Sequence, residues 1–344
     1  MTTPTFHAIG EQNHAETLPK SQRHYRRVTA CVDASPVSLK VIAHGVTIAN
    51  ALGAELILMH VLDAEPDRGT PSDPIEWDLR RREACSHVEM LARDRADEVG
   101  GIQAHVVQGR AAEQICKWAR NHQVDLTVVC TRGDGDAREW ELGGTARRII
   151  DCVPGSVLLV PACVEESQTV RYRRILVPLD GSSRAESALP IALRVAEAQS
   201  AEIVLVHAVP EPELTEIGPL EREDEELRKR VLCRNERVAQ VYLDRIHTRI
   251  ADKGVSIRTL MLRGGDARHL LSRAILDQSA DLTILTSHGR SGHLDVAAGS
   301  VTAFLIAHAA APLLIVRHQS AASTPRERAA PNRSGIRLPS AAIP

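Results

Sequence analysis

The sequence predicts an α/β protein of two tandem domains, each a doubly wound, five-stranded parallel sheet. Three observations predict this fold class: a long internal repeat, short apolar runs that alternate with helical patterns, and a length of 344 residues. That length suits two domains of about 150 residues each. The segment 28–33 returns as 175–180, and 56–61 returns as 203–208, both 147 residues later. A repeat of this size is a whole domain, which indicates a tandem duplication.

The elements follow from the pattern inside each repeat. Apolar, β-branched runs predict strands, and because these runs are continuous rather than alternating, the sheet should be parallel and covered on both faces. Four helical crossovers then connect five strands in each copy. In the first copy the expected strands are near 27–32, 55–61, 102–107, 125–130 and 156–160. In the second copy they are near 174–179, 202–208, 255–261, 281–286 and 312–316, with helices near 184–199, 221–252, 266–279 and 299–310.

The domain boundaries follow from the same pattern. We expect domain 1 at 25–162 and domain 2 at 172–318, joined by a polar linker at 163–171. Residues 1–24 lack periodicity and are expected to form a flexible leader, and the tail 319–344, rich in Ala, Ser, Pro and Arg, should be disordered. The second copy carries nine extra residues, which we expect in or just before the helix near 221–252. The charged run at its start is typical of a solvated helix face.

Composition excludes several classes of function. The formal charge is −2 and aromatic residues make up 2% of the chain, so neither a basic field nor stacking platforms favour nucleic-acid binding. The apolar runs are of strand length, and neither a membrane span nor a signal peptide is expected, which suggests a cytoplasmic protein. Seven cysteines without a Cys-x-x-Cys spacing suggest buried free thiols, among them Cys31, Cys130 and Cys152.

The candidate site lies at three strand ends of the second copy, because ligands of open α/β sheets bind beyond the carboxyl ends of the strands. Asp180 closes the first strand, and Gly264-Gly265-Asp266 follows the third. The fourth strand ends in Thr286-Ser287-His288-Gly289-Arg290, and Gly299-Ser300 then opens a helix. Glycines and a helix N-terminus suit a phosphate. The alternative is an ordinary glycine-rich turn in which Ser300 only caps the helix.

The segment from Leu285 to Val316 resembles the end of a universal stress protein domain. ATP-binding members of that family carry Gly-x-x-Gly-x9-Gly-Ser/Thr here, and Gly289, the nine-residue spacer, Gly299 and Ser300 match. Thr286 departs from the pattern by replacing its first glycine. The resemblance covers about 25–162 and 172–318, and it implies an adenine nucleotide α-hydrolase-like fold in both repeats.

The resemblance also implies roles for individual residues. Asp180 would contact the ribose, and the backbone near Ala208 would meet the adenine edge. Gly289, Gly299, Ser300 and Val301 would hold the phosphates of ATP, with Mg²⁺ or another divalent cation bridging phosphate oxygens. His288 and Arg290 would add hydrogen bonds or positive charge. The β-carbon of Thr286 puts the closest backbone approach in doubt.

The same alignment indicates that the site of the first copy is degenerate. Cys130 stands at the first glycine, Gly133 and Gly143 match the next two, and Gly144 replaces the serine. The loop between the last two glycines carries four acids and one base, which would repel a triphosphate unless metals intervene. Asp33 stands at the position of Asp180, so binding of an adenosine-like ligand remains an alternative for this copy.

These observations predict a nucleotide-responsive stress or signalling module rather than a fast enzyme, with at most slow ATP hydrolysis and no assigned catalytic residue. The two domains should pack as a pseudo-dimer, and the whole chain could form a homodimer. The alternative is an interaction protein whose clefts have both decayed. Neither Gly-x4-Gly-Lys-Ser/Thr nor Gly-x-Gly-x-x-Gly occurs. His60 and His207 recur at equivalent strand ends, which favours a role in the fold over metal binding.

Overall fold

The computed structural model describes residues 25–63, 74–132, 142–165, 167–212, 222–289, 298–308 and 310–317. The predicted leader and tail, and Arg290, lie outside the described residues. The first half contains β1 (Arg27–Val32), α1 (Val37–Leu52), β2 (Glu55–Leu62), α2 (Pro74–Arg93), β3 (Ile102–Gln108), α3 (Ala111–Asn121), β4 (Leu126–Cys130), α4 (Gly144–Cys152) and β5 (Ser156–Val160). The second contains β6 (Arg174–Pro178), α5 (Ser183–Glu186), α6 (Leu189–Gln199), β7 (Glu202–Val209), α7 (Arg222–Ile250), β8 (Ile257–Arg263), α8 (Ala267–Asp277), β9 (Leu282–Thr286), α9 (Ser300–Ala307) and β10 (Leu313–Val316).

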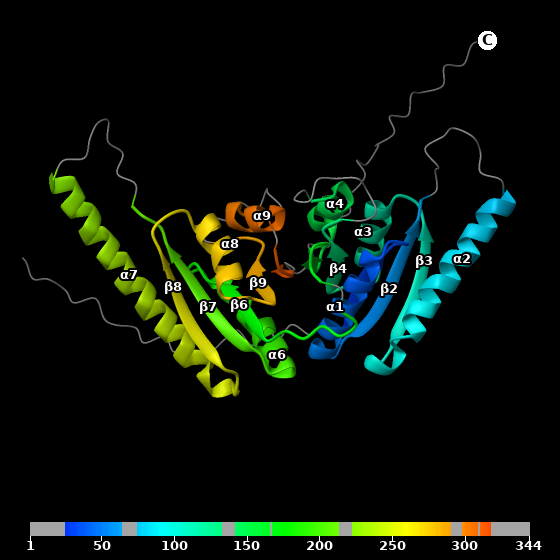
Figure 1. Ribbon diagram of the computed structural model, residues 1–344, viewed down its shortest axis with the longest axis horizontal. Helices are drawn as coiled ribbons and strands as arrows, with labels where there is room; N and C mark the ends of the chain where they lie inside the picture. Colours follow the sequence, from blue (N-terminus) through cyan, green and yellow to red (C-terminus); the bar gives the residue numbers. More distant parts are fainter. Residues whose placement is uncertain are drawn as a thin grey trace, which may run out of the picture.

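The strands form one ten-stranded sheet in the order β3-β2-β1-β4-β5-β10-β9-β6-β7-β8 (Figure 1). Neighbouring strands are parallel within each half, and β5 and β10 pair antiparallel where the halves meet. The α/β fold class with its doubly wound order is therefore confirmed. The winding reverses between β1 and β4 in one half and between β6 and β9 in the other, and such a switch point is where ligands of this architecture bind.

Helices cover both faces of the sheet. Apolar residues of α1, α2, α6 and α7 pack on one face, and those of α3, α4, α8 and α9 pack on the other. In Figure 1, α2 and α7 flank the two ends of the sheet, while α1 and α6 lie near its middle. Strand residues such as Leu158 and Leu314 are fully buried, as continuous apolar strands require. Each such side chain contributes about 1.5–3 kcal/mol by leaving water.

The prediction of a single helix at 184–199 is wrong in one respect, because the structure divides this segment into α5 and α6. Pro190 lies in the first turn of α6, where its missing N–H costs nothing. In a continuous helix Pro190 would have no N–H to donate to Glu186 O, and its ring would crowd that carbonyl, so the helix is interrupted there. The equivalent position of the unbroken α1 is Ala43, which carries no such restriction.

The insertion of the second copy lengthens one helix. The helix α7 has 29 residues, whereas its counterpart α2 has 20. The register shows that Ile102 of β3 is equivalent to Ile257 of β8, 155 residues later, whereas α3 and α8 begin 156 residues apart. Eight of the nine extra residues thus precede β8, as expected. The ninth lies in the turn at Gly264 and Gly265, which corrects the expectation that all nine precede this strand.

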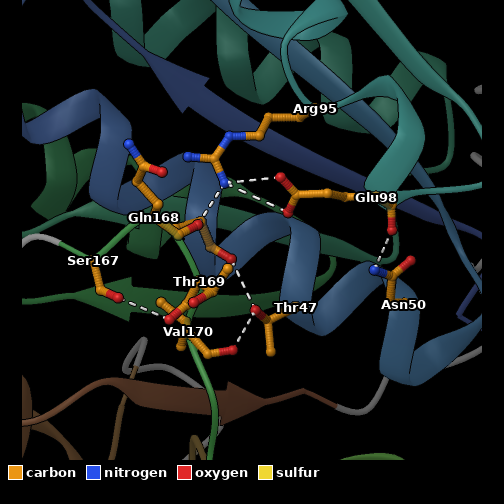
Figure 2. A network of polar contacts seen from close by, with 9 residues as sticks. Thr47, Asn50, Arg95, Glu98, Ser167, Gln168, Thr169 and Val170 are labelled. Atoms are coloured by element: carbon orange, nitrogen blue, oxygen red, sulfur yellow. Dashed lines mark hydrogen bonds and ion pairs between the residues drawn. The ribbon is translucent and has the colours of Figure 1, made fainter.

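The linker packs along domain 1 (Figure 2). Thr47 of α1 donates its hydroxyl hydrogen to Val170 O at 3.0 Å, and Arg95 donates to Gln168 O at 2.5 Å. A cavity of about 290 Å³ lies beside this contact, lined by apolar side chains of α1 and α2 and by the polar atoms of the linker. The backbone of the linker is thus held by side chains of domain 1 at Gln168 and Val170.

Three further contacts connect the halves. The His44 Nδ1 and the Tyr172 hydroxyl lie 2.8 Å apart in the core, and burial lowers the pKa of His44 to about 4. Arg194 of α6 donates to Leu52 O at 2.5 Å. At the end of β10, the Arg317 guanidinium donates to backbone carbonyls at the end of α4, including Val153 O at 2.6 Å. The two halves therefore share both a sheet and buried polar contacts.

The cysteines depart from the sequence prediction. Cys116 and Cys152 form a disulfide pair with their Cα atoms 5.9 Å apart, so the expected free thiol at Cys152 is wrong. Spacing along the sequence did not show this pair, because α3 and α4 bring the two residues together from 36 positions apart. Cys31 and Cys130 are free, and burial raises the pKa of both thiols, to about 12 for Cys31. Within the described residues, no helix combines the length and the apolar character needed to span a bilayer.

Candidate functional site

The site begins at Asp180, which follows β6 at the switch point of the second half. Asp180 Oδ1 accepts hydrogen bonds from Ser182 N at 2.9 Å and from Ser182 Oγ at 2.6 Å. The same Ser182 hydroxyl caps α5 by accepting from Ala185 N at 3.1 Å. The turn is closed by Gly181, whose φ of +84° is open mainly to glycine. The carboxylate is thereby held in one orientation, with Oδ2 turned away from the serine.

Asp180 lies directly against Gly289. A methyl group in place of the Gly289 hydrogen would collide with Asp180 Oδ2, so alanine at this position would force the carboxylate to move. Gly299 approaches the same segment, because its N–H donates to Ser287 O at 2.7 Å. The structure therefore brings together the predicted ribose residue and the predicted phosphate loop, which are more than 100 residues apart in the sequence.

Two threonines hold this loop in shape. Thr302 of α9 donates its hydroxyl hydrogen to Thr286 O at 2.9 Å, and Thr286 donates its own to His288 O at 2.9 Å. Thr286, which replaces the first glycine of the motif, thus bridges the turn that leads to Gly289. The Nδ1 atom of His288 lies 3.1 Å from Ser287 Oγ. Arg290 lies outside the described residues, and its predicted role stays a prediction.

The helix α9 presents its N-terminus to this loop. Gly299 is the N-cap residue and, among the described residues, no side chain caps it. The first N–H groups of a helix have no partner within the helix, so they are donors for an anion. Ser300 at the first position is exposed, and Val301 after it is half-buried. By contrast, the Asp266 side chain caps α8 by accepting from Arg268 N at 2.8 Å, and Gly264-Gly265-Asp266 is accounted for as a helix start.

Ala208 lies at the end of β7, next to β6. The preceding residue, His207, approaches Leu179 O with Nδ1 at 2.8 Å, and His60 approaches Val32 O in the same way at 3.0 Å. Burial lowers the pKa of His207, partly offset by this hydrogen bond and by Asp180, so the ring is neutral at pH 7. The recurring histidines connect the first two strands of each half, as a role in the fold predicts.

Sequence reasoning missed Tyr242 of α7. Its ring lies 5.8 Å from the ring of His207, and its buried hydroxyl lies beside the carboxylate of Glu186. Burial first, and then the carboxylates of Glu186 and Asp180, raise the pKa of Tyr242. A tyrosine in the middle of a long charged helix gives no signal of this position. Thr302 was missed because only the packing of α9 brings it to the loop, whereas Ser182 lies two residues after Asp180 and its role is local.

The first half keeps the backbone frame of this site. Gly143 N donates to Thr131 O at 2.8 Å, as Gly299 does to Ser287, and no described side chain caps α4. Asp33 accepts hydrogen bonds from Ser35 and Ser38, as Asp180 does from Ser182. The halves differ in their side chains. Gly144 stands in place of Ser300, Cys130 stands in place of Thr286, and Lys40 donates to Ala162 O at 2.7 Å near Cys130.

Comparison with known proteins agrees with this geometry. The sequence model of the universal stress protein family matches residues 24–161 and 171–317. The chain belongs to the universal stress protein family. Among its relatives, a universal stress protein of Mycolicibacterium smegmatis is 26% identical over 300 residues, which is 83% of this chain and 95% of the relative. Universal stress protein MJ0531 of Methanocaldococcus jannaschii is 29% identical over 145 residues, or 40% of this chain and 82% of the relative.

A solved structure supports the tandem fold. The crystal structure of a universal stress protein from Archaeoglobus fulgidus covers 85% of this chain and 98% of its own, with a TM-score of 0.60 and 18% identity. At that identity the likeness concerns the fold. The universal stress protein described here therefore contains two family domains in one chain, and the chemistry of its site has to be argued from its own residues.

Proposed function

We propose that the second domain binds ATP together with a divalent cation such as Mg²⁺, and that the protein acts as a nucleotide-responsive stress or signalling module in the cytoplasm. One observation carries this proposal: Asp180 lies against Gly289, beside the N-terminus of α9, which no described side chain caps. An acceptor for ribose hydroxyls and a set of backbone donors for phosphates thus stand side by side at the switch point.

Each described residue of the site has a proposed role that fits its position, and Arg290 has one by its place in the sequence. The Asp180 carboxylate would accept from the ribose, and the backbone at Ala208 would meet the adenine edge. Gly289 and Gly299 allow phosphates close to the backbone, and Ser300 and Val301 would donate from the first turn of α9. His288, Thr286 and Arg290 would complete the loop around the phosphates, where the cation would screen the negative charge.

The first domain is proposed as the structural or regulatory partner. The antiparallel pairing of β5 with β10 and the contact between α1 and α6 support a pseudo-dimer of the two domains. Gly144 lacks the hydroxyl of Ser300, and Lys40 is engaged at the end of β5, which favours a degenerate site there. Association of two chains into a homodimer is a further proposal that the fold permits.

The proposal includes no fast catalysis. Phosphoryl transfer needs a positioned nucleophile and positive charge on the transferred group. The groups assigned above serve to hold the nucleotide, so we expect at most slow ATP hydrolysis. The rival function is an interaction protein with two decayed clefts, which the β-carbon at Thr286 favours. The engaged hydroxyl of Thr286 weighs against it, because this residue supports the turn at Gly289.

Matched variants of the two domains test the proposal. A fluorescent ATP analogue is titrated with Mg²⁺ into the wild type, Ser300→Gly and Gly144→Ala. Loss of one hydroxyl donor to a phosphate should weaken binding about tenfold in Ser300→Gly, since a hydrogen bond to a charged group contributes about 1.5–3 kcal/mol. Gly144→Ala should bind as the wild type does, because a Cβ there meets nothing within 4 Å and adds no hydroxyl donor.

The outcomes separate the two functions. Equal affinity of Ser300→Gly and the wild type would remove Ser300 from the phosphate site. Equal weakening by both substitutions would show that the effect is not specific to the second domain. If nucleotide-free wild-type protein does not bind the analogue at millimolar concentrations, the interaction protein becomes the better description.

A further inference from the structure

Cys116 and Cys152 form a pair that the nucleotide site does not use. Cys116 lies in the middle of α3, and Cys152 is the last residue of α4. Their Cα atoms are 5.9 Å apart, within the range of protein disulfides, and their sulfur atoms are in contact. All seven cysteines are described, and the remaining five have no disulfide partner: Cys31, Cys85, Cys130, Cys163 and Cys233. The pairing is therefore selective.

The fold itself does not require this pair. The positions 156 residues further on are Ser272 in α8 and His308 at the end of α9. The second domain has the same helices, packed on the same face of the sheet, without a sulfur at either position. A covalent connection between these two helices is thus an added property of the first domain.

The two cysteines differ in their access to solvent. Cys116 is 3% exposed within the apolar cluster, whereas Cys152 is partly exposed at the helix end. The Cys152 sulfur lies 3.7 Å from Ile149 O, a carbonyl that can accept a hydrogen bond from the thiol once the pair is reduced.

The pair adjoins the contact between the domains. The carbonyls of Ile150 and Val153, on either side of Cys152, accept hydrogen bonds from the Arg317 guanidinium at the end of β10. A bond from Cys152 to α3 would restrain these carbonyls. The oxidation state of domain 1 can thereby change how firmly the end of domain 2 is held.

We propose that Cys116 and Cys152 are a reversible thiol–disulfide pair, confined to domain 1, whose oxidation ties the end of α4 to α3 and stiffens the contact with Arg317. The pair rests on its own geometry and is independent of nucleotide binding. The oxidant is a low-molecular-weight disulfide, RSSR, and the overall exchange consumes two protein thiols and RSSR and yields one protein disulfide and two RSH.

The order of steps follows from exposure. The Cys152 thiolate, after losing its proton to solvent, attacks one sulfur of RSSR, which forms a mixed disulfide and releases RS⁻. The Cys116 thiolate then attacks the Cys152 sulfur, which forms the internal bond and releases the second RS⁻, and each RS⁻ takes up one proton. An external dithiol reverses the sequence by attacking the more exposed Cys152 sulfur.

Peptide mapping of the full-length protein tests the pair. The protein is equilibrated with oxidised or reduced glutathione, quenched with acid, alkylated and digested without reduction. Oxidised wild type should give one cross-linked peptide joining Cys116 and Cys152, and reduced dithiothreitol should restore both thiols without denaturant. The variant Cys116→Ala should stop at the first step and accumulate glutathione on Cys152.

Two outcomes would overturn the proposal. Alkylation of both cysteines after oxidation would show that no internal bond forms, and a cross-link that resists dithiothreitol in the native protein would make it a permanent bond. Hydrogen exchange tests the stiffening: amides of 149–153 should exchange more slowly in the oxidised wild type than in the reduced form. Cys152→Ser should show no such difference, and equal exchange in both wild-type forms would refute the effect on the Arg317 contact.

Discussion

At the scale of single residues, the closest approach in the site is between Asp180 and Gly289. The carboxylate occupies the space that any side chain at position 289 would need. Two hydrogen bonds from Ser182 hold the carboxylate there, so it cannot turn aside without losing them. The closeness of Asp180 therefore explains the glycine at position 289 in the ligand-free protein, independently of phosphate binding.

We expect Gly289→Ala to lower both stability and nucleotide affinity. The collision with Asp180 should cost about 1–3 kcal/mol, the usual range for overpacking. Urea denaturation measures the loss, with Gly144→Ala as a control, because its Cβ meets open space at the start of α4 in domain 1. If Gly289→Ala were as stable as the wild type, Asp180 would have to be mobile, and its place in the site would be wrong.

The hydroxyl of Tyr242 should matter more for nucleotide binding than for stability. It lies beside the Glu186 carboxylate without a full hydrogen bond, so Tyr242→Phe should change stability by no more than about 1 kcal/mol. If the hydroxyl meets the nucleotide near Asp180, the same variant should bind ATP about five to ten times more weakly. Thermal denaturation and a binding titration on one preparation measure both. A clear loss of stability would show that the hydroxyl has a partner in the free protein.

At the scale of elements, α1 is connected to the start of β6 through His44 and Tyr172. Burial lowers the folded-state pKa of His44 to about 4 from an ordinary value of 6.5. The unfolded chain then binds the proton more readily, so this stability is complete above pH 6.5 and is lost as the pH falls toward 4. We expect a loss of about 2 kcal/mol between pH 7.5 and 5 from this residue.

The comparison of the wild type with His44→Gln isolates this effect. Glutamine keeps a hydrogen-bonding group beside Tyr172 but does not titrate in this range. Urea denaturation at both pH values should show a steeper decline for the wild type than for the variant. Parallel declines would mean that His44 is not buried as a neutral ring.

The elements also show what the sequence can predict. The strands were predictable because buried parallel strands are continuous apolar runs, and the extra length of α7 because the repeat offset changes before β8. The break between α5 and α6 depends on one proline, and the pairing of Cys116 with Cys152 depends on how α3 packs against α4. A contact between two packed helices, such as that of Cys116 with Cys152, arises from tertiary structure and leaves no periodic signal in the sequence.

At the scale of the whole molecule, the halves share a sheet but differ in chemistry. The candidate site was predictable at Asp180, Gly289 and Gly299, because glycine spacing and strand ends are local features. Its supporting residues were not, since Tyr242 and Thr302 reach the loop only through the packing of α7 and α9. The first half keeps the backbone frame, so the asymmetry rests on side chains such as Gly144 and Lys40.

This asymmetry is the central claim, and the stoichiometry of nucleotide binding tests it most directly. Calorimetric titration of nucleotide-free protein with ATP and Mg²⁺ should give one site per chain, which is lost when Gly299→Ala and Ser300→Ala are combined. Two sites per chain would contradict the account, because the first domain would then bind nucleotide despite lacking the hydroxyl that Ser300 supplies.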